Sequence, residues 1–351
     1  MGLLKELLKP LAEDGAAMTR EQAAAVLEEI LAGKAADVEI AALLAVLATR
    51  GEQAPELAGF VDVMRRRVVP LPLSESERAE LVDCVGTGGG GPQTFNISCG
   101  AALVAAAAGA KVAKHGNRAV TSRCGAADVL EALGVPIDLP PERAVECLRE
   151  TGFVFLFAPL YHPAMMAMGP LRKALGFRTI FNLVGPLTNP AHAKTQVVGV
   201  LAPSRVLLVG RALAALGSRR AFVVHGTDGI DELTTTGESV VARIEQKEDG
   251  TPELHAARVT PEMAGVPRAK LEDFIGGDIE ANTQLLFDVL TGIPGARRDI
   301  VLLNAAAVLV AANLAGDLKQ GVAMSAEAID SGEAAALLAK LRQFGAKYGP
   351  Q

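Results

Sequence analysis

The spacing of apolar residues predicts that the first 70 residues form helices only. Thr19 and Gln22 match a capping box, and the apolar positions that follow recur at helical spacing as far as Gly33, which ends the run. Asp37 is the expected N-cap of a second helix, which ends at Arg50.

A third helix is expected over residues 55–67, and two prolines then break the helical pattern within residues 69–74. That short segment has the composition of a linker. The sequence therefore predicts a helical domain over residues 1–73 and a second domain over residues 74–351.

Beyond residue 74, short apolar runs alternate with helical stretches. The candidate strands are residues 81–85, 111–113, 153–157, 197–201 and 221–224. The candidate helices between them are residues 98–109, 125–133, 141–151 and 205–216. This alternation predicts an α/β domain with a mostly parallel central sheet flanked by helices. After a break at Gly276 and Gly277, the tail from Glu280 is again helical.

Composition narrows the class of protein. Half of the 351 residues are hydrophobic and 21% are charged, which excludes an intrinsically disordered chain because ample apolar surface offsets chain entropy. Aromatic residues make up only 4%, so the core is expected to be aliphatic. The longest apolar run, residues 100–110, is shorter than the roughly 18 residues of a membrane span, and no signal peptide is recognisable. A cytoplasmic protein without a membrane partner is expected.

Cysteine usage and charge weigh against further classes. Cys84, Cys99, Cys124 and Cys147 show no CxxC spacing, which disfavours a zinc site and a secreted disulfide framework. The formal net charge of −6 weighs against a nucleic-acid partner.

The first candidate site is the glycine cluster at residues 86–91, which directly follows a predicted strand. It matches GxGxxG, but a dinucleotide-binding unit needs an acidic residue roughly 20 positions later, and that neighbourhood is basic here. It is no P-loop, because Pro92 stands where lysine is needed. A flexible glycine loop is the alternative. Asn96 or Ser98 at the start of the next helix favours a phosphate site.

The second candidate site follows the next strand, at residues 114–118. Lys114, Arg118 and Arg123 supply positive charge within ten residues, and Thr121 and Ser122 supply hydroxyls. Such a set can neutralise and hydrogen-bond a polyphosphate. A solvated basic loop is the alternative, which a second cluster at a strand end makes less attractive.

The third and fourth candidate sites would bind a metal ion and a carboxylate. Asp231 and Glu232 follow the strand at 221–224 and suit Mg²⁺, which one or two carboxylates and substrate phosphates often hold together. Arg172 lies between two proline-rich turns, where a fixed guanidinium can clamp a carboxylate. The alternatives are a solvated acidic loop and a structural ion pair. Met165, Met166 and Met168 are interpreted as packing residues.

Together these segments resemble the anthranilate phosphoribosyltransferase family. The motifs that carry the resemblance are DCVGTGG, TFNIS, VAKHGNR, ADVLEALG, HPAM, RTIFNLVGPLTNPA and HGTDGIDEL, in this order from one end of the chain to the other. The resemblance implies transfer of the phosphoribosyl group of 5-phosphoribosyl 1-pyrophosphate (PRPP) to anthranilate in tryptophan biosynthesis, with Mg²⁺ as cofactor. It also implies a homodimer through the helical domain, which part of residues 163–190 would join in space.

The resemblance assigns roles residue by residue. The implied PRPP site is formed by Gly86, Gly89, Gly90, Thr94, Asn96, Ile97, Ser98, Cys99, Lys114, Arg118, Ser122 and Ala126. The implied anthranilate site is formed by Gly86, His115, Asn117 and Arg172, and the implied Mg²⁺ ligands are Ser98, Asp231 and Glu232. No residue is implied as a dedicated acid or base, so positioning and electrostatics would carry the reaction.

This chain departs from the family pattern inside these motifs. The family usually has Asp at position 90, Thr at 99, Ser at 124 and 126, and a basic residue at 166, where this chain has Gly90, Cys99, Cys124, Ala126 and Met166. The alternatives are a paralogue of the same fold, including a nucleic-acid-binding relative, and a nucleoside phosphorylase. KHGNR and the segment around Arg172 favour anthranilate over a nucleoside.

Overall fold

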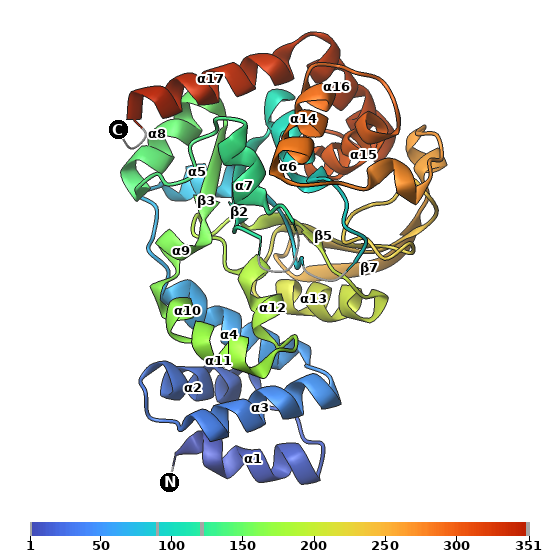
Figure 1. The fold of residues 1–351 in the computed structure, drawn as a ribbon. Helices are drawn as coiled ribbons and strands as arrows, with labels where there is room; N and C mark the ends of the chain where they lie inside the picture. Colours follow the sequence, from blue (N-terminus) through green and yellow to red (C-terminus); the bar gives the residue numbers. More distant parts are fainter. Residues whose placement is uncertain (1, 89–90, 120–122, 349–351) are drawn as a thin grey trace.

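A small helical domain and a larger α/β domain make up the molecule (Figure 1). The computed structural model describes residues 2–88, 91–119 and 123–348. The small domain begins with four helices: α1 (Leu3–Glu13), α2 (Arg20–Leu31), α3 (Asp37–Arg50) and α4 (Ala54–Arg66). A short helix, α5 (Glu75–Glu80), then leads into the sheet.

The starts of these helices follow from local hydrogen bonds. The capping box at α2 is confirmed, because Thr19 Oγ1 accepts from Gln22 N at 3.2 Å and Thr19 N donates to Gln22 Oε1 at 2.9 Å. The cap expected at Asp37 is wrong. Ala36 is the N-cap of α3, and the Glu39 carboxylate accepts from its backbone N–H at 3.0 Å, so Asp37 is already the first helical residue.

The central sheet has seven strands in the order β3-β2-β1-β4-β5-β6-β7. Their bounds are β1 (Leu81–Gly86), β2 (Lys111–Gly116), β3 (Phe153–Phe157), β4 (Thr195–Gly199), β5 (Arg220–Gly226), β6 (Ser239–Gln246) and β7 (Pro252–Val259). The first five are parallel, which confirms the predicted fold class. β6 and β7 are antiparallel additions that the apolar pattern did not reveal.

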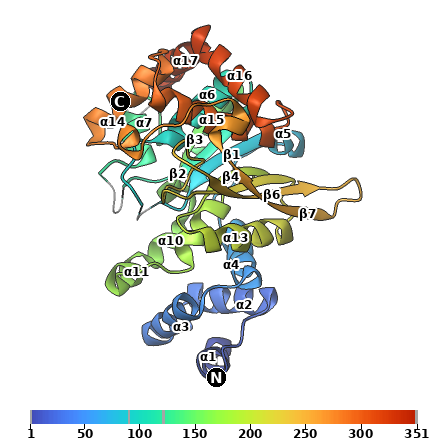
Figure 2. The ribbon, with the colours of Figure 1, turned by 90° about the vertical axis from the view of Figure 1, so that its right-hand side faces the viewer.

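Helices cover the two faces of the sheet differently. One face of the sheet shares a hydrophobic core with the helices that cover it. These helices are α6 (Ile97–Ala107), α7 (Ala126–Ala132), α8 (Pro141–Thr151), α14 (Ile279–Leu290), α15 (Ala296–Ala311), α16 (Leu318–Asp330) and α17 (Glu333–Tyr348). The other face packs on α13 (Pro203–Ala215), which lies between the sheet and the small domain (Figure 2). No helix in the described ranges is long and apolar enough to cross a membrane.

The chain returns to the small domain after β3. The returning helices are α9 (Ala158–Tyr161), α10 (Pro163–Ala167), α11 (Gly169–Leu175) and α12 (Phe181–Val184), and the 3₁₀ turn η1 (Gly185–Leu187) follows them. Phe181 packs on Phe60 of α4 with ring centroids 5.7 Å apart, inside the hydrophobic core that holds α2, α3 and α4. The returning segment therefore lies between the two domains.

Candidate functional site

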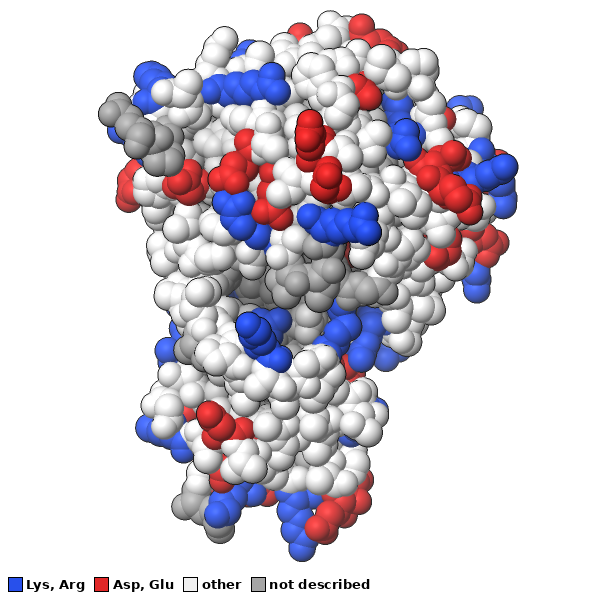
Figure 3. Space-filling model, viewed as in Figure 1, with Lys and Arg blue, Asp and Glu red and all other residues white. Residues whose placement is uncertain are grey.

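The candidate site lies at the carboxyl ends of the parallel strands. From β1 the chain continues to β2 and β3 on one side, and β4 and β5 lie on the other side of β1. Ligands of open α/β sheets bind where the strand order reverses in this way, outside the carboxyl ends. Figure 3 shows a hollow between the two domains on this face, with Lys and Arg side chains along its lower side.

The glycine loop after β1 interlocks with the acidic loop after β5. Gly88 N donates to Asp231 Oδ2 at 3.0 Å, and a Cβ at Gly86 would lie 2.4 Å from the same oxygen. A Cβ at Gly91 would lie 2.5 Å from the carbonyl oxygen of Gly229. At Gly91 the neighbouring atom belongs to the backbone, so a side chain there would force the two loops apart. The predicted site residues Gly89 and Gly90 lie outside the described residues.

Arg178 closes this loop from the side of the returning segment. Its guanidinium donates to the carbonyl oxygens of Gly88, at 2.7 Å, and Thr87, at 3.4 Å. Burial lowers the pKa of Arg178, and the nearby charge of Asp231 opposes that change. The loop after β1, the loop after β5 and the segment between the domains therefore meet at one point.

The acidic pair fits a divalent cation. Burial raises the pKa of Glu232 well above its usual value, and the neighbouring charge of Asp231 adds to the effect. Glu232 Oε2 is enclosed and has no hydrogen-bond partner. A cation beside the two carboxylates would favour the ionised form of Glu232 and give its Oε2 a partner. Among residues 2–88, 91–119 and 123–348, no group of three or more His, Cys, Asp and Glu is arranged to hold a metal.

Lys114 connects the predicted phosphate segments. Its buried ammonium donates to Cys84 O at 2.5 Å and to Ser98 Oγ at 3.3 Å. The charge of Glu232 also acts on Lys114. Ser98, Lys114 and Glu232, which the sequence analysis assigned to three separate segments, are therefore brought together in space.

The loop that starts α6 presents its residues in two ways. Thr94 and Asn96 are partly exposed at the strand ends, whereas Ile97 and Cys99 are fully buried. A role of Ile97 or Cys99 toward PRPP would therefore use backbone groups. Burial raises the pKa of the Cys99 thiol and raises that of Cys84 to about 12, so both are neutral at pH 7.

The second basic segment is more strongly paired than its sequence indicates. Arg118 forms two hydrogen bonds with Glu131 and one with Asp128. Asp128 also accepts from Ala119 N and Gly125 N, both at 2.9 Å. The PRPP role assigned to Arg118 stays a prediction. It requires the guanidinium to bind a phosphate while it also pairs with Glu131 and Asp128.

The other predicted residues of this segment stand close by. Asn117 Oδ1 accepts from Arg118 N at 2.7 Å, and Asn117 O accepts from Ala127 N. Ala126 is partly buried at the first position of α7, beside the end of β2 at Gly116. Ser122 lies outside the described residues.

His115 contacts the returning segment, and Arg172 belongs to it. The rings of His115 and His162 lie 4.9 Å apart, and burial lowers the pKa of both, that of His162 to about 4. His115 N donates to Asp83 Oδ1 at 3.0 Å, and burial raises the pKa of Asp83 to about 6. Arg172 is partly buried and stacks 5.6 Å from the centroid of the Phe181 ring.

Arg172 forms no ion pair with the described part of the chain. Burial lowers the pKa of its guanidinium, because the charged form is desolvated without a counter-charge. An anionic ligand group would supply that counter-charge. The ion pair considered as the alternative for this residue is absent among the described residues.

Two buried asparagines on the C-terminal helices escaped the sequence analysis. Asn282 of α14 reaches the loop before α6, and Asn304 of α15 holds both backbone groups of Leu233, next to Glu232. Asn304 carried a usable signal, because it is the single polar residue in the fully buried stretch 300–311. Asn282 lies in a mixed helix and offered none.

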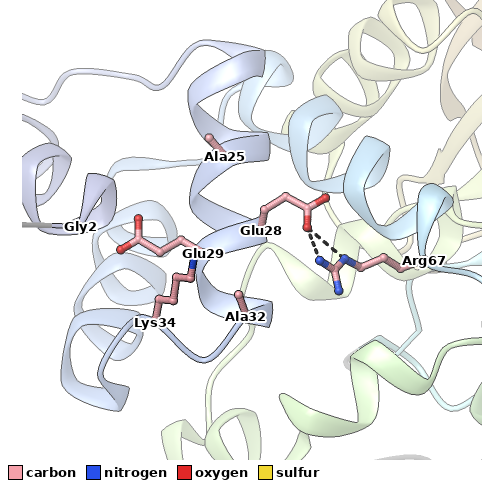
Figure 4. Close-up of a pocket in the computed structure, with 7 residues that line it drawn as sticks. All are labelled: Gly2, Ala25, Glu28, Glu29, Ala32, Lys34 and Arg67. Carbon is pink, nitrogen blue, oxygen red and sulfur yellow. Dashed lines mark hydrogen bonds and ion pairs between the residues drawn. The ribbon is translucent and has the colours of Figure 1, made fainter.

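A second hollow lies away from the strand ends. It is an open groove of about 820 Å³ beside α2, lined by residues that include Glu28, Lys34 and Arg67 (Figure 4). Glu28 is paired with both Arg66 and Arg67. This groove lacks the phosphate-type loops of the first site.

Comparisons with known proteins find relatives that match nearly the whole chain. The model of the glycosyl transferase family, a/b domain, matches residues 78–335, and that of the same family's helical bundle domain matches residues 5–68. The anthranilate phosphoribosyltransferases of Rhodopseudomonas palustris (strain BisA53) and Moorella thermoacetica are each 49% identical to this chain. The alignments cover 93% and 92% of this chain, and 94% and 93% of the relatives.

Solved structures give the same result. Anthranilate phosphoribosyltransferase from Thermus thermophilus superposes with a TM-score of 0.88 at 43% identity, covering 98% of this chain and 99% of that one. The enzyme from Saccharomyces cerevisiae, in complex with PRPP and Mg, superposes with a TM-score of 0.85 at 26% identity, covering 98% of both chains.

Proposed function

The chain belongs to the anthranilate phosphoribosyltransferase family, and we propose that it transfers the phosphoribosyl group of PRPP to the amine of anthranilate, releasing pyrophosphate. The observation that carries the proposal is the interlocking of the glycine loop after β1 with Asp231, beside Lys114 and Glu232. This arrangement joins a phosphate-type loop, a buried cation and a carboxylate pair at one end of the sheet.

The residues of the site divide the work between the two substrates. Asn96, Ser98 and Lys114 would bind the pyrophosphate group, and Ser98, Asp231 and Glu232 would hold Mg²⁺, which suits the enclosed Glu232 Oε2. Mg²⁺ bound there would stabilise the negative charge that develops on the leaving pyrophosphate. Lys114 supplies a fixed positive charge for the same purpose.

Anthranilate would bind between β2 and the returning segment. Arg172 would hold its carboxylate, and His115, neutral because burial lowers its pKa, would border the ring. The aromatic amine is uncharged at pH 7 and has a free lone pair, so it needs no general base. Fixing this amine against the ribose carbon is the main task of the cleft.

The proposal includes a cytoplasmic homodimer formed through the helical domain. The support is an apolar side chain on the surface of this domain: Val38 of α3 is 74% exposed, more than the other exposed large hydrophobic side chains in the described structure. Sedimentation velocity on the full chain tests the dimer directly.

The decisive experiment mixes the pure protein with Mg²⁺, PRPP and anthranilate and follows the decay of anthranilate fluorescence. The chain has no tryptophan, so its own emission is weak. We expect decay that requires both PRPP and the protein. Stable fluorescence beside an active control enzyme would overturn the assignment, and phosphorolysis of thymidine or uridine would favour a nucleoside phosphorylase instead.

Two neighbouring variants on α11 test the carboxylate role. Arg172→Ala should raise the KM for anthranilate by roughly 10- to 100-fold, since a hydrogen bond to a charged group is lost, and should leave the KM for PRPP unchanged. Lys173→Ala is the matched control, because it removes the same positive charge, one position away, from a side chain that is exposed. Equal effects of the two variants, or an equal rise of both KM values, would contradict the role of Arg172.

A further inference from the structure

Asn282 is a buried asparagine that no assignment above uses. It lies on α14, is 2% exposed and reaches across to the loop that starts α6. Its Oδ1 accepts from Gly277 N at 2.7 Å, and its Nδ2 donates to Asn96 Oδ1 at 3.1 Å. Asn96 Nδ2 in turn donates to Cys124 O, at 3.4 Å. One chain of amides thus joins the C-terminal helices to both phosphate loops.

The partners at both ends of this series of hydrogen bonds fix which amide atoms donate and which accept. A backbone N–H such as that of Gly277 can only donate, so the oxygen of Asn282 must face it. The nitrogen of Asn282 is then the group that faces Asn96, and Asn96 must present its oxygen in return. The carbonyl of Cys124 can only accept, which agrees with a nitrogen of Asn96 on that side.

The surroundings make this contact tight. The segments 93–95 and 274–276 are joined by hydrogen bonds from Phe95 N to Phe274 O and from Gly276 N to Gln93 O, at 2.8 and 2.9 Å. A Cβ at Gly276 would lie 2.6 Å from Asn282 Oδ1. Asn96 is the N-cap of α6, yet its side chain makes no capping hydrogen bond. Its amide is therefore committed to Asn282 and not to its own helix.

We propose that Asn282 is a positioning residue that orients the amide of Asn96, so that Asn96 offers a hydrogen-bond donor and not an acceptor to a phosphate oxygen. An amide nitrogen carries two hydrogens, and the contact with Cys124 O uses one of them. The second remains for the anionic group. This inference rests on the proposed function, because it takes PRPP as the ligand of Asn96.

The substitution Asn282→Asp tests whether position 282 decides which amide atom Asn96 turns toward the phosphate. The new carboxylate keeps the shape of the side chain and still accepts from Gly277 N, but it cannot donate to Asn96. Asn96 must then turn its nitrogen toward position 282 and its oxygen toward the phosphate. We expect the KM for PRPP to rise roughly tenfold or more, because a donor is replaced by an acceptor that repels the anion, with little change in the KM for anthranilate.

A double-mutant cycle separates this role from a structural one. In an Asn96→Ala background there is no amide left to orient, so adding Asn282→Asp should change the KM for PRPP by less than threefold. Asn282→Leu, which removes the donor without adding charge, repeats the cycle if Asn282→Asp folds poorly. Ser325→Ala is the control, since the Ser325 hydroxyl is buried on α16 and donates to Gly321 O of its own helix.

The outcomes distinguish this inference from the function beneath it. The unaltered protein is first titrated with PRPP and Mg²⁺ by calorimetry, without anthranilate. Failure to bind PRPP would overturn the proposed function and the inference together. Normal binding by the unaltered protein with an unchanged KM in Asn282→Asp would overturn the inference alone. Equal effects of position 282 with and without the Asn96 amide would also overturn it, because the role would then be structural.

Discussion

Among single residues, the buried histidines show how the fold sets a protonation state. His162 is 4% exposed and stands against His115, and burial lowers its pKa to about 4 from an ordinary value of 6.5. It is therefore neutral at pH 7 in the folded protein. In the unfolded chain it regains its ordinary pKa, which makes folding stability depend on pH.

We expect His162→Gln to flatten the acid side of the stability profile. Because the folded pKa is the lower one, the unfolded state takes up the proton first, and stability falls as the pH drops from 6.5 toward 4. Between pH 7 and pH 5 the unaltered protein should lose about 2 kcal/mol more unfolding free energy than the variant. Urea titrations of both proteins at both pH values measure this difference. Parallel profiles would contradict it.

The sequence predicted individual site residues where their chemistry lies in a local pattern. Glycines after a strand, a lysine at the next strand end and an adjacent carboxylate pair could each be recognised from near neighbours. Asn282 could not, because its partner Asn96 is 186 positions away. The pairing of Arg118 with Glu131 was hidden for a related reason, because the two residues are 13 positions apart and lie in different elements.

For whole elements, burial on both faces decided which strands were predictable. β1 to β4 are buried along nearly their whole length, and each contains a short apolar run that the sequence pattern reveals. β7 lies at the edge of the sheet and is mostly exposed, so its sequence, PELHAARV, shows no clear alternation. β6 pairs with it and carries charged residues among its buried positions. β6 is placed by its pairing with β5 and β7 by its pairing with β6, and a local sequence pattern does not report such pairing.

Helix α15 positions the acidic loop through one side chain. Asn304 is 3% exposed, accepts from Leu233 N at 2.9 Å and donates to Leu233 O at 2.8 Å. The same loop is tightened by Asp228, whose carboxylate accepts from the hydroxyls of Thr234 and Thr236. Glu232 precedes Leu233 directly, so its backbone is held by a helix from the far side of the core.

Asn304→Leu should weaken both folding and metal use. Two backbone groups of Leu233 lose their buried partner, at about 1–3 kcal/mol each, and Glu232 loses its fixed position. We expect the unfolding free energy to fall by about 2–4 kcal/mol. The Mg²⁺ concentration for half-maximal rate should rise roughly tenfold, and protection against heat by Mg²⁺ with PRPP should shrink.

Ser325→Ala on the neighbouring helix α16 provides the comparison for this prediction. It also removes a buried hydrogen-bonding group, but one that bonds within its own helix and touches neither loop. Its Mg²⁺ dependence should stay unchanged. A loss of stability in Asn304→Leu without any change in Mg²⁺ dependence would show that the hydrogen bonds between Asn304 and Leu233 serve folding alone.

The whole molecule is connected through a hydrophobic core that both domains share. This core holds buried residues of α2, α3 and α4, of the returning segment, of α13 and of the sheet face that packs on α13. Two polar contacts cross the same boundary: Arg205 of α13 pairs with Glu52, and Arg20 of α2 donates to Ala215 O at 2.7 Å. The two domains are therefore expected to unfold together, although the sequence divides them at a linker.

Leu57→Ala tests this coupling from within the helical domain. Leu57 is fully buried on α4, and its truncation should lower the unfolding free energy by about 2–5 kcal/mol. Both tyrosines, Tyr161 and Tyr348, lie outside helices α1–α4, and Tyr161 is buried with its hydroxyl on Leu139 O. Tyrosine fluorescence therefore reports on the α/β domain, whereas circular dichroism reports on all helices. With a shared core, Leu57→Ala should shift both transitions equally. A shift confined to circular dichroism, leaving the tyrosine transition in place, would mean that the helical domain unfolds on its own.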